Sequence, residues 1–133
     1  MANKNKGTKH ENELFDLINK SWRVVRTAGS GTKRDADCDL IAGKNGNIYV
    51  IEVKSTKKKV VYISKNQLNR LQKFSEEFGA IPIIALRFPR EKFRFCFIED
   101  GEVKKNSIKF GKRVYLTFQE LFIWLLKKEE LKK

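Results

Sequence analysis

The sequence is poor in several residue types, and each shortage narrows what the protein can be. It has two cysteines, two prolines and one histidine among 133 residues. Cys38 and Cys96 form no C-x-x-C pair and lie in strand-like runs, so we expect buried thiols rather than zinc ligands or a disulfide. The longest apolar runs, AIPIIAL and LFIWLL, fall short of the ~20 residues that span a membrane. We therefore expect no membrane-spanning segment.

Acidic residues are also scarce relative to basic ones. Lys and Arg total 29 against 16 Asp and Glu, which gives a formal net charge of +13. The positive charges repel one another in a compact fold, so this excess favours a polyanionic partner. Nucleic acid is the leading candidate, and an anionic membrane surface or an acidic protein comes second. A lysine-rich surface of the thermophilic kind is the plain alternative. Because MANKNKGTKHENE has no apolar core, we expect a protein that is not secreted. Together with the basic charge, this predicts a cytoplasmic, DNA-associated protein.

The length and an apolar content of 41% predict one domain over residues 1–133. We expect residues 1–7 to be flexible, a first helix from about Thr8 to Lys20, and a C-terminal helix within 117–133. A second helix is expected from a cap at Ser64 to about Phe78, ending at Gly79.

Six segments between these helices have strand character. They are residues 22–27, 38–43, 47–55, 60–63, 81–88 and 93–99, and residues 100–113 show it weakly. Helices and strands in this order predict an α/β fold, with a central mixed β-sheet of about five strands flanked by helices.

Two of these strands form a hairpin that places two carboxylates together. Asn45-Gly46 between apolar runs is the strongest short-range hairpin signal, and it pairs residues whose numbers sum to 91. Asp39 then faces Glu52, with Cβ atoms about 4.5–5.5 Å apart. Such a pair repels itself unless a cation lies between. It suits Mg²⁺, which binds one or two carboxylates together with waters and phosphate oxygens.

Lys54 lies on the same strand face as Glu52, about 7 Å further along. A one-residue slip of the hairpin would separate Asp39 from Glu52. A partly buried Glu52–Lys54 ion pair is the plain alternative to a metal site. Glu11 extends the apolar stripe of the first helix, where it either completes a capping box with Thr8 or points at the metal site.

A magnesium site, a nearby lysine and a basic surface together indicate phosphodiester hydrolysis. Mg²⁺ can activate water and neutralise the phosphate, and we expect Mn²⁺ to substitute for it. Lys54 can orient the attacking water or stabilise charge in the transition state. The segment GSGTKR lacks the G-x-x-x-x-G-K-[ST] spacing, so no nucleotide cofactor is expected.

The motifs also resemble a known group of nucleases. Asp39, twelve intervening residues and EVK resemble the PD-(D/E)xK nuclease superfamily. Over about residues 6–99 the chain is similar to the archaeal Holliday junction resolvases, in KGT, VVRTAGSGT (24–32), DLIAG (39–43), IEVKS (51–55) and QLNRLQKFSEEFGAIPIIALRF (67–88). The resemblance implies a restriction-endonuclease-like fold. It also implies a homodimeric, Mg²⁺-dependent endonuclease that makes paired, symmetric nicks in four-way DNA junctions.

The resemblance assigns roles to residues as well. Asp39 and Glu52 would be the metal-binding carboxylates and Lys54 the catalytic lysine. Glu11 would be a further catalytic acid and metal ligand on the first helix. Arg26 corresponds to a basic active-site or DNA-contacting position.

Further assignments fall on a loop and on basic residues. Ser30 or Thr32 would carry the functional hydroxyl of a mobile loop. The family more often has apolar residues or proline where this chain has Asp35 and Asp37, and Asp37 is a candidate accessory ligand. The basic residues expected to contact DNA phosphates are Lys6, Lys33, Arg34, Lys57, Lys58 and Lys59.

Two other functions stay open. One is a PD-(D/E)xK endonuclease that acts on other repair or duplex DNA substrates, and the other is a non-catalytic DNA-binding module on this fold. The complete set of candidate catalytic residues argues against the second.

A homodimer has a physical rationale in the symmetry of the substrate. Two sites related by a two-fold axis make two matched cuts. Leu71, Phe74 and Phe78 form an apolar stripe that serves as core or as interface, and FRFCFIE (93–99) is a second candidate surface.

Overall fold

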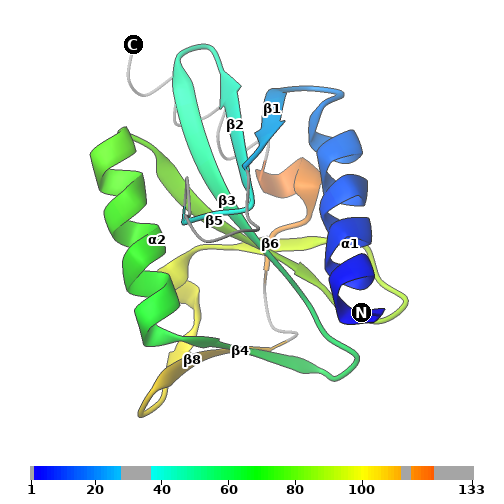
Figure 1. Cartoon of the computed structure of the whole chain (residues 1–133), viewed down its shortest axis with the longest axis vertical. Helices are drawn as coiled ribbons and strands as arrows, with labels where there is room; N and C mark the ends of the chain where they lie inside the picture. Colours follow the sequence, from blue (N-terminus) through cyan, green and yellow to red (C-terminus); the bar gives the residue numbers. More distant parts are fainter. Residues whose placement is uncertain (1, 28–36, 112–114, 122–133) are drawn as a thin grey trace.

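A five-stranded sheet lies between two helices in the computed structural model, which describes residues 2–27, 37–111 and 115–121 (Figure 1). The helices are α1 (Ala2–Ile18) and α2 (Lys65–Phe78). In spatial order the strands are β1 (Arg23–Arg26), β2 (Leu40–Lys44), β3 (Asn47–Ser55), β5 (Ile81–Arg87) and β6 (Arg94–Cys96). β3 and β5 are parallel and the other neighbours antiparallel. The predicted mixed sheet flanked by helices is confirmed.

The sheet buries a separate apolar cluster on each face, because successive residues of a strand point to opposite sides. Leu14 of α1 belongs to the cluster that contains Ile51, and Leu71 of α2 belongs to the cluster that contains Val50. β3 is therefore covered on both faces. Among the described residues, the buried polar side chains are Glu52, within this strand, and Ser75.

Local turn and cap signals place these elements as expected. Asn45 and Gly46 have φ values of 52° and 83°, so the β2–β3 hairpin turns through two residues with positive φ, as a type I′ turn requires. α2 begins after Ser64, whose side chain accepts a hydrogen bond from the Gln67 N–H. It ends at Gly79 in the left-handed region.

A second, three-stranded sheet was not expected from the sequence. It consists of β4 (Val60–Ser64), β8 (Ser107–Gly111) and β7 (Glu102–Val103), in that order, and it lies below the main sheet in Figure 1. The segment expected as a strand over 93–99 is shorter, because a 3₁₀ turn, η1 (Ile98–Asp100), follows β6.

The ends of the helices differ in how well they were predicted. α1 begins at Ala2, so the expected start and capping box at Thr8 are wrong. No proline interrupts residues 2–7, so the helix can extend through them although Asn3, Asn5 and Gly7 do not favour it. Near the other end, the Thr117 N–H donates to Glu120 Oε1 (3.1 Å) and the Glu120 N–H to Thr117 Oγ1 (3.3 Å), a capping box where the last helix was expected to start. Residues 122–133 of that helix lie outside the described residues.

The two cysteines and the short apolar runs also have counterparts in the fold. Cys38 and Cys96 are free and buried, as expected. β2 begins at Leu40, so Cys38 precedes the strand that was expected to contain it. Across residues 2–27, 37–111 and 115–121, no helix combines the length and the apolar character that a membrane crossing needs.

Candidate active site

Asp39 is the residue immediately before β2, and it lies beside β3. The observed pairing of Leu40 with Ile51 and of Ala42 with Tyr49 confirms the predicted register. One residue earlier, the Asp39 N–H still donates to the Ile51 carbonyl (2.9 Å), while Asp39 Oδ2 accepts the N–H of Val53 (2.7 Å). The side chain thus takes the place of a strand partner and holds the carboxylate against β3.

Glu52 is the adjacent carboxylate on β3, and it is 5% exposed. Burial and the charge of Asp39 raise the pKa of Glu52 to about 7, although Lys54 acts in the opposite direction. An acid this deeply buried beside a second acid destabilises the fold at neutral pH. The expected pair of neighbouring carboxylates is therefore present.

Lys54 joins the same cluster from two residues further along β3. Its Nζ lies 3.3 Å from Glu52 Oε2, and 31% of its side chain is exposed. The ion pair offered as the alternative to a metal site is therefore present in the protein alone. The partial exposure leaves the ammonium accessible to a molecule that approaches from solvent.

Glu11 reaches the cluster from α1. Its Oε1 lies 3.1 Å from Nη2 of Arg26, at the end of β1, and Arg26 Nη1 donates to Asn12 Oδ1 (2.6 Å). Burial and the charge of Asp39 raise the pKa of Glu11, and Arg26 lowers it. The structure thus brings Glu11 and Arg26 into the electrostatic neighbourhood of Asp39, although α1 begins earlier than expected.

Gln67 is a member of the site that sequence reasoning did not identify. It lies in the first turn of α2, and its Nε2 donates to Glu52 Oε2 at 2.6 Å. The segment Ser64-Lys65-Asn66-Gln67 fits the S-x-x-Q pattern of a capping box, in which the glutamine side chain folds back on the cap. That pattern marks Gln67 as a helix-start residue but does not reveal that its side chain contacts Glu52.

The acids fit a hard cation bound with few protein ligands. Within the described part of the chain, no group of three or more His, Cys, Asp or Glu side chains is arranged as a ready metal cage. Mg²⁺ does not need one, since it retains waters and uses one or two carboxylates together with phosphate oxygens. Asp39 and Glu52 supply two such carboxylates. Burial and, after it, the charge of Asp39 raise the pKa of Glu52, and a bound cation would offset both effects.

Other predicted site residues lie elsewhere or outside the described residues. Ser30, Thr32, Lys33, Arg34 and Asp35 fall in 28–36, which is outside the described residues, as is the side chain of Lys6 on α1. Asp37 Oδ1 lies 3.7 Å from Arg70 Nε of α2, which gives it a partner other than the two central acids.

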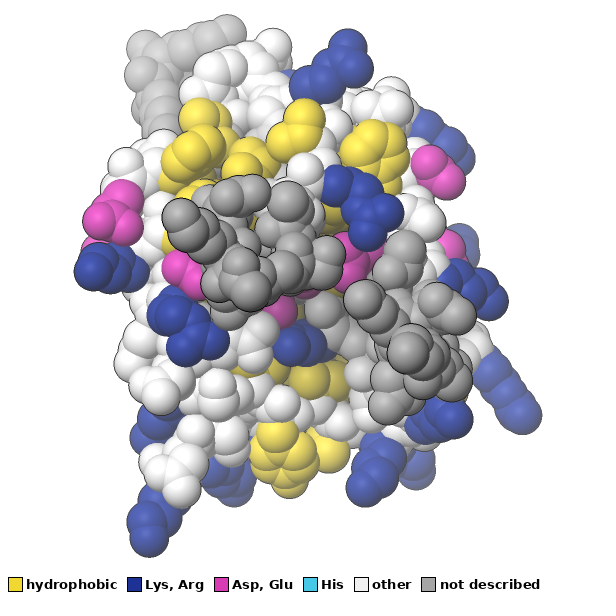
Figure 2. Space-filling model, viewed as in Figure 1, with side chains coloured by type: hydrophobic (Ala, Val, Ile, Leu, Met, Phe, Trp, Pro, Cys, Tyr) yellow, Lys and Arg dark blue, Asp and Glu magenta, His cyan; other side chains and the backbone are white. Residues whose placement is uncertain are grey.

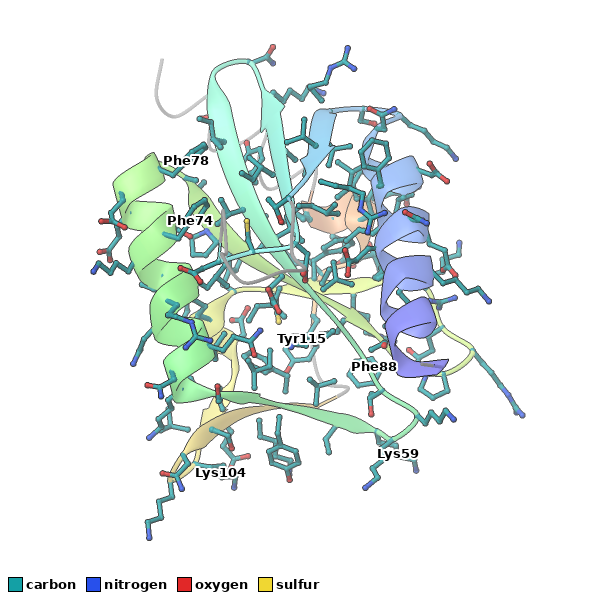
Figure 3. All side chains as sticks on the ribbon, viewed as in Figure 1. Lys59, Phe74, Phe78, Phe88, Lys104 and Tyr115 are labelled. Atoms are coloured by element: carbon teal, nitrogen blue, oxygen red, sulfur yellow. The ribbon has the colours of Figure 1, made fainter. Side chains whose placement is uncertain are left out.

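The predicted phosphate contacts between β3 and β4 are exposed. Lys57, Lys58 and Lys59 lie in that connection, and Figure 3 labels Lys59 at its tip. In Figure 2, Lys and Arg side chains predominate over the lower half of the visible face, where β4, β8 and the start of α2 lie, and acidic side chains gather nearer the middle.

A separate pocket lies apart from the candidate catalytic residues. A pocket of about 480 Å³ is lined by residues of α1, β5 and the segment that starts the last helix, including Glu13, Arg87 and Phe118. None of the candidate catalytic residues lines it. His10 Nδ1 lies 3.8 Å from Oε1 of Glu13, one of the lining residues.

The chain resembles known proteins over most of its length. A sequence model of a family described as "Archaeal holliday junction resolvase (hjc)" matches residues 2–127. The crossover junction endodeoxyribonuclease Hjc of Archaeoglobus fulgidus is 34% identical over 113 residues, which cover 84% of this chain and 83% of that protein. A crossover junction endodeoxyribonuclease of Sulfolobus islandicus rod-shaped virus 1 is 35% identical over 109 residues, covering 78% and 90%.

The fold itself matches a solved structure. The structure of Archaeoglobus fulgidus Hjc, described as a Holliday junction resolvase from an archaeal hyperthermophile, superposes with a TM-score of 0.79 at 30% identity. The match covers 86% of this chain and 98% of that one. The restriction-endonuclease-like fold implied by the sequence motifs is confirmed by this likeness.

Proposed function

This chain belongs to the archaeal Holliday junction resolvase family, and from that membership and the geometry of the site we propose that it resolves four-way DNA junctions. The reaction is Mg²⁺-dependent hydrolysis of one phosphodiester bond per active site. A homodimer makes the two symmetric nicks. The whole of residues 1–133 acts as a single nuclease domain.

The observation that carries the proposal is the buried Glu52 next to Asp39. A purely structural strand would place an apolar residue at a position that is 5% exposed and covered on both faces of the sheet. The chain instead has the carboxylate of Glu52 there. The Val53 N–H, which donates to Asp39, holds a second carboxylate beside it. Such an arrangement is costly to the apoprotein and useful to a cation-binding one.

Each residue of the cluster has a task in the proposed reaction. Asp39 and Glu52 hold the cation, with Glu11 as a further acid. When bound, Mg²⁺ neutralises charge on the phosphate and activates a water for attack. Lys54 keeps its ammonium beside Glu52 and stabilises the charge that develops on the phosphate. Arg26 holds Glu11 and contacts the DNA backbone.

The surface around the site suits a DNA duplex. The net charge of +13 and the lysines exposed between β3 and β4 provide a sequence-independent attraction to phosphates. Lys57, Lys58 and Lys59, which follow Lys54 along the chain, make these contacts, and Lys6, Lys33 and Arg34 add to them. Ser30 or Thr32 supplies the hydroxyl expected from the loop between β1 and β2.

The apolar stripe on α2 supports the homodimer. Leu71 is buried in the core, whereas Phe78, further along the helix, is 48% exposed. Phe74 and Phe78 stack with ring centroids 5.3 Å apart and planes at 14° (Figure 3). Phe74 is half-buried against the core, so Phe78 is the exposed member of the pair, and an exposed aromatic side chain is typical of a contact surface. Phe93 and Phe95, from the other candidate segment, are buried in the core and are not available for such a contact.

Cleavage of a synthetic four-way junction tests the proposal. We expect paired nicks by the wild type with Mg²⁺ or Mn²⁺ and none with EDTA. Glu52→Ala should lose cleavage while still binding the junction, because DNA affinity comes mainly from surface lysines. Glu102→Ala is the matched control, since it removes an exposed carboxylate of β7 that contacts Lys104.

Other outcomes would favour the other functions. Equal or faster cutting of linear duplex of the same length would indicate a different DNA substrate. Salt-dependent junction binding without cleavage in either cation would indicate a binding module. Normal cleavage by Glu52→Ala would refute the site assignment.

A further inference from the structure

We propose that Gln67 is a positioning residue for the metal-binding carboxylate Glu52, an inference that rests on the function proposed above. Gln67 Nε2 donates to Glu52 Oε2 at 2.6 Å, the shortest of the contacts described for that carboxylate. Gln67 is half-buried, and Glu52 is 5% exposed. The bond therefore lies largely out of water, where a hydrogen bond to an ionised group contributes most.

The backbone of Gln67 is fixed from two directions. Its N–H donates to the side chain of Ser64 (3.1 Å), the residue that caps α2. Ser64 is also the last residue of β4 and pairs with Ser107 of β8, and the next N–H, of Lys65, donates to the Asn106 carbonyl (3.1 Å). The second sheet thus anchors the start of α2 and sets the point from which the Gln67 side chain extends.

This anchoring explains why the side chain departs from its usual role. In a capping box, the glutamine three residues after the cap bonds the N–H of the cap residue. Here the cap residue Ser64 is part of a β-ladder, and the Gln67 side chain reaches across to β3 instead. The geometry assigns the amide to Glu52 and not to the helix terminus.

Gln67 and Lys54 hold Glu52 by the same oxygen. Gln67 and Lys54 both contact Oε2 of Glu52, and neither uses Oε1. Asp39 is the other neighbour of this carboxylate, so a cation held by both acids would not need to displace Gln67. An amide suits this task because it fixes the carboxylate without adding positive charge, whereas a second ammonium would repel the cation.

Without the amide, Lys54 is the remaining described contact of Oε2. The carboxylate is then free to rotate toward the ammonium, and the cation must compete with that ion pair. Removal of a partner that orients a metal ligand typically costs about 10–100-fold in metal affinity or activity. We expect an effect of that order for loss of the Gln67 amide.

Gln67→Met tests this inference, since methionine keeps the length of the side chain and lacks the donor. Gln72→Met is the matched control, because Gln72 makes the same kind of bond to Glu76 Oε1 (3.0 Å) on the exposed face of the same helix. Gln67→Asn is a second test variant that keeps an amide too short to reach Glu52. It retains a polar helix start if the methionine variant fails to fold.

The main readout is Mn²⁺ affinity of the full chain without DNA, measured by calorimetry beside thermal unfolding in EDTA. We expect both Gln67 variants to bind Mn²⁺ at least ~10-fold more weakly than the wild type, and Gln72→Met to bind it normally. Junction cleavage by the Gln67 variants should need a correspondingly higher Mg²⁺ concentration and recover when that is supplied. A purely structural role would lower the melting temperature without changing the cation requirement.

The two proposals fail in different ways. Wild-type Mn²⁺ affinity in folded Gln67→Met and Gln67→Asn would overturn the positioning role, whatever the cleavage result. A wild type that binds no Mn²⁺ would overturn it as well. If the wild type binds Mn²⁺ and cuts no junction, the proposed function fails, and the Mn²⁺ affinities still decide the role of Gln67.

Discussion

Replacing Glu52 by glutamine should make the protein more stable at neutral pH while it abolishes cleavage. The wild-type carboxyl is buried beside Asp39, and these two causes raise its pKa from the ordinary value of 4.5 to about 7. Glutamine has nearly the same shape and no charge, and its amide can still accept the bond from Gln67. Function is then the reason why the chain retains the less stable residue.

The direction follows from proton binding by the two states. Between pH 4.5 and about 7 the folded protein keeps the proton that the unfolded chain has lost, so stability falls as the pH rises through this window. At about 1.4 kcal/mol per pH unit, the loss is about 3 kcal/mol. Glu52→Gln avoids this loss, and the favourable effect of Lys54 on the ionised carboxylate is already contained in the pKa of about 7.

The expected gain is therefore about 3 kcal/mol at pH 8, which for a domain of this length corresponds to about 11 °C in melting temperature. The assay is urea and thermal unfolding of the wild type and Glu52→Gln in EDTA, at pH 5, 6, 7 and 8. The two proteins should agree within about 1 kcal/mol at pH 5 and diverge above pH 6. Glu102→Gln, at an exposed position, is the control and should show no such divergence.

Two results would refute this reasoning. One is a constant difference between wild type and Glu52→Gln from pH 5 to pH 8, which would mean that Glu52 titrates normally in the folded protein. The other is a Glu52→Gln protein that is less stable than the wild type at pH 8, which would mean that the ion pair with Lys54 outweighs the burial of the charge.

Three further predictions concern the scaffold. Ser64→Ala removes the cap of α2 and should lower the free energy of unfolding by about 1 kcal/mol in urea, whereas Ser64→Gly should cost only a few tenths. Gly101→Ala should cost about 1–3 kcal/mol, because its Cβ would lie 2.7 Å from Cε1 of the fully buried Phe110; a melting temperature equal to the wild type would contradict this. Cys38 and Cys96 should not react with a thiol reagent at pH 8 until the protein unfolds, since burial raises the pKa of both thiols, that of Cys38 to about 12.

The hairpin could be predicted from the sequence because a short-range signal determines it. Asn45 and Gly46 both adopt positive φ, and these two residue types accept that conformation at the lowest cost. Once the turn is centred, the register of β2 and β3 follows by counting, and the neighbouring positions of Asp39 and Glu52 follow from the register. The same local logic located the start and end of α2 through Ser64 and Gly79.

The second sheet could not be found in this way because its pairing is not local. β4 pairs with β8 more than forty residues later in the chain, and β7 is a two-residue strand whose residues are both exposed. Neither alternation nor a turn signal links such segments. The contact of Gln67 with Glu52 depends on this sheet, so it was missed for the same reason.

The arrangement of partners around the three acids explains how such a site can exist before a cation arrives. Asp39 is held by the Val53 N–H, Glu52 by Gln67 and Lys54, and Glu11 by Arg26. These donors come from α2 and from the strands β1 and β3, so the carboxylates are oriented by the fold itself. A cation bound as proposed would meet ligands whose rotamer entropy was lost on folding and not on binding. This preorganisation lowers the stability of the fold, because the charged carboxylate of Glu52 is buried and is not hydrated. We therefore expect the stability gained by Glu52→Gln and the cation affinity lost by Gln67→Met to be two consequences of one arrangement.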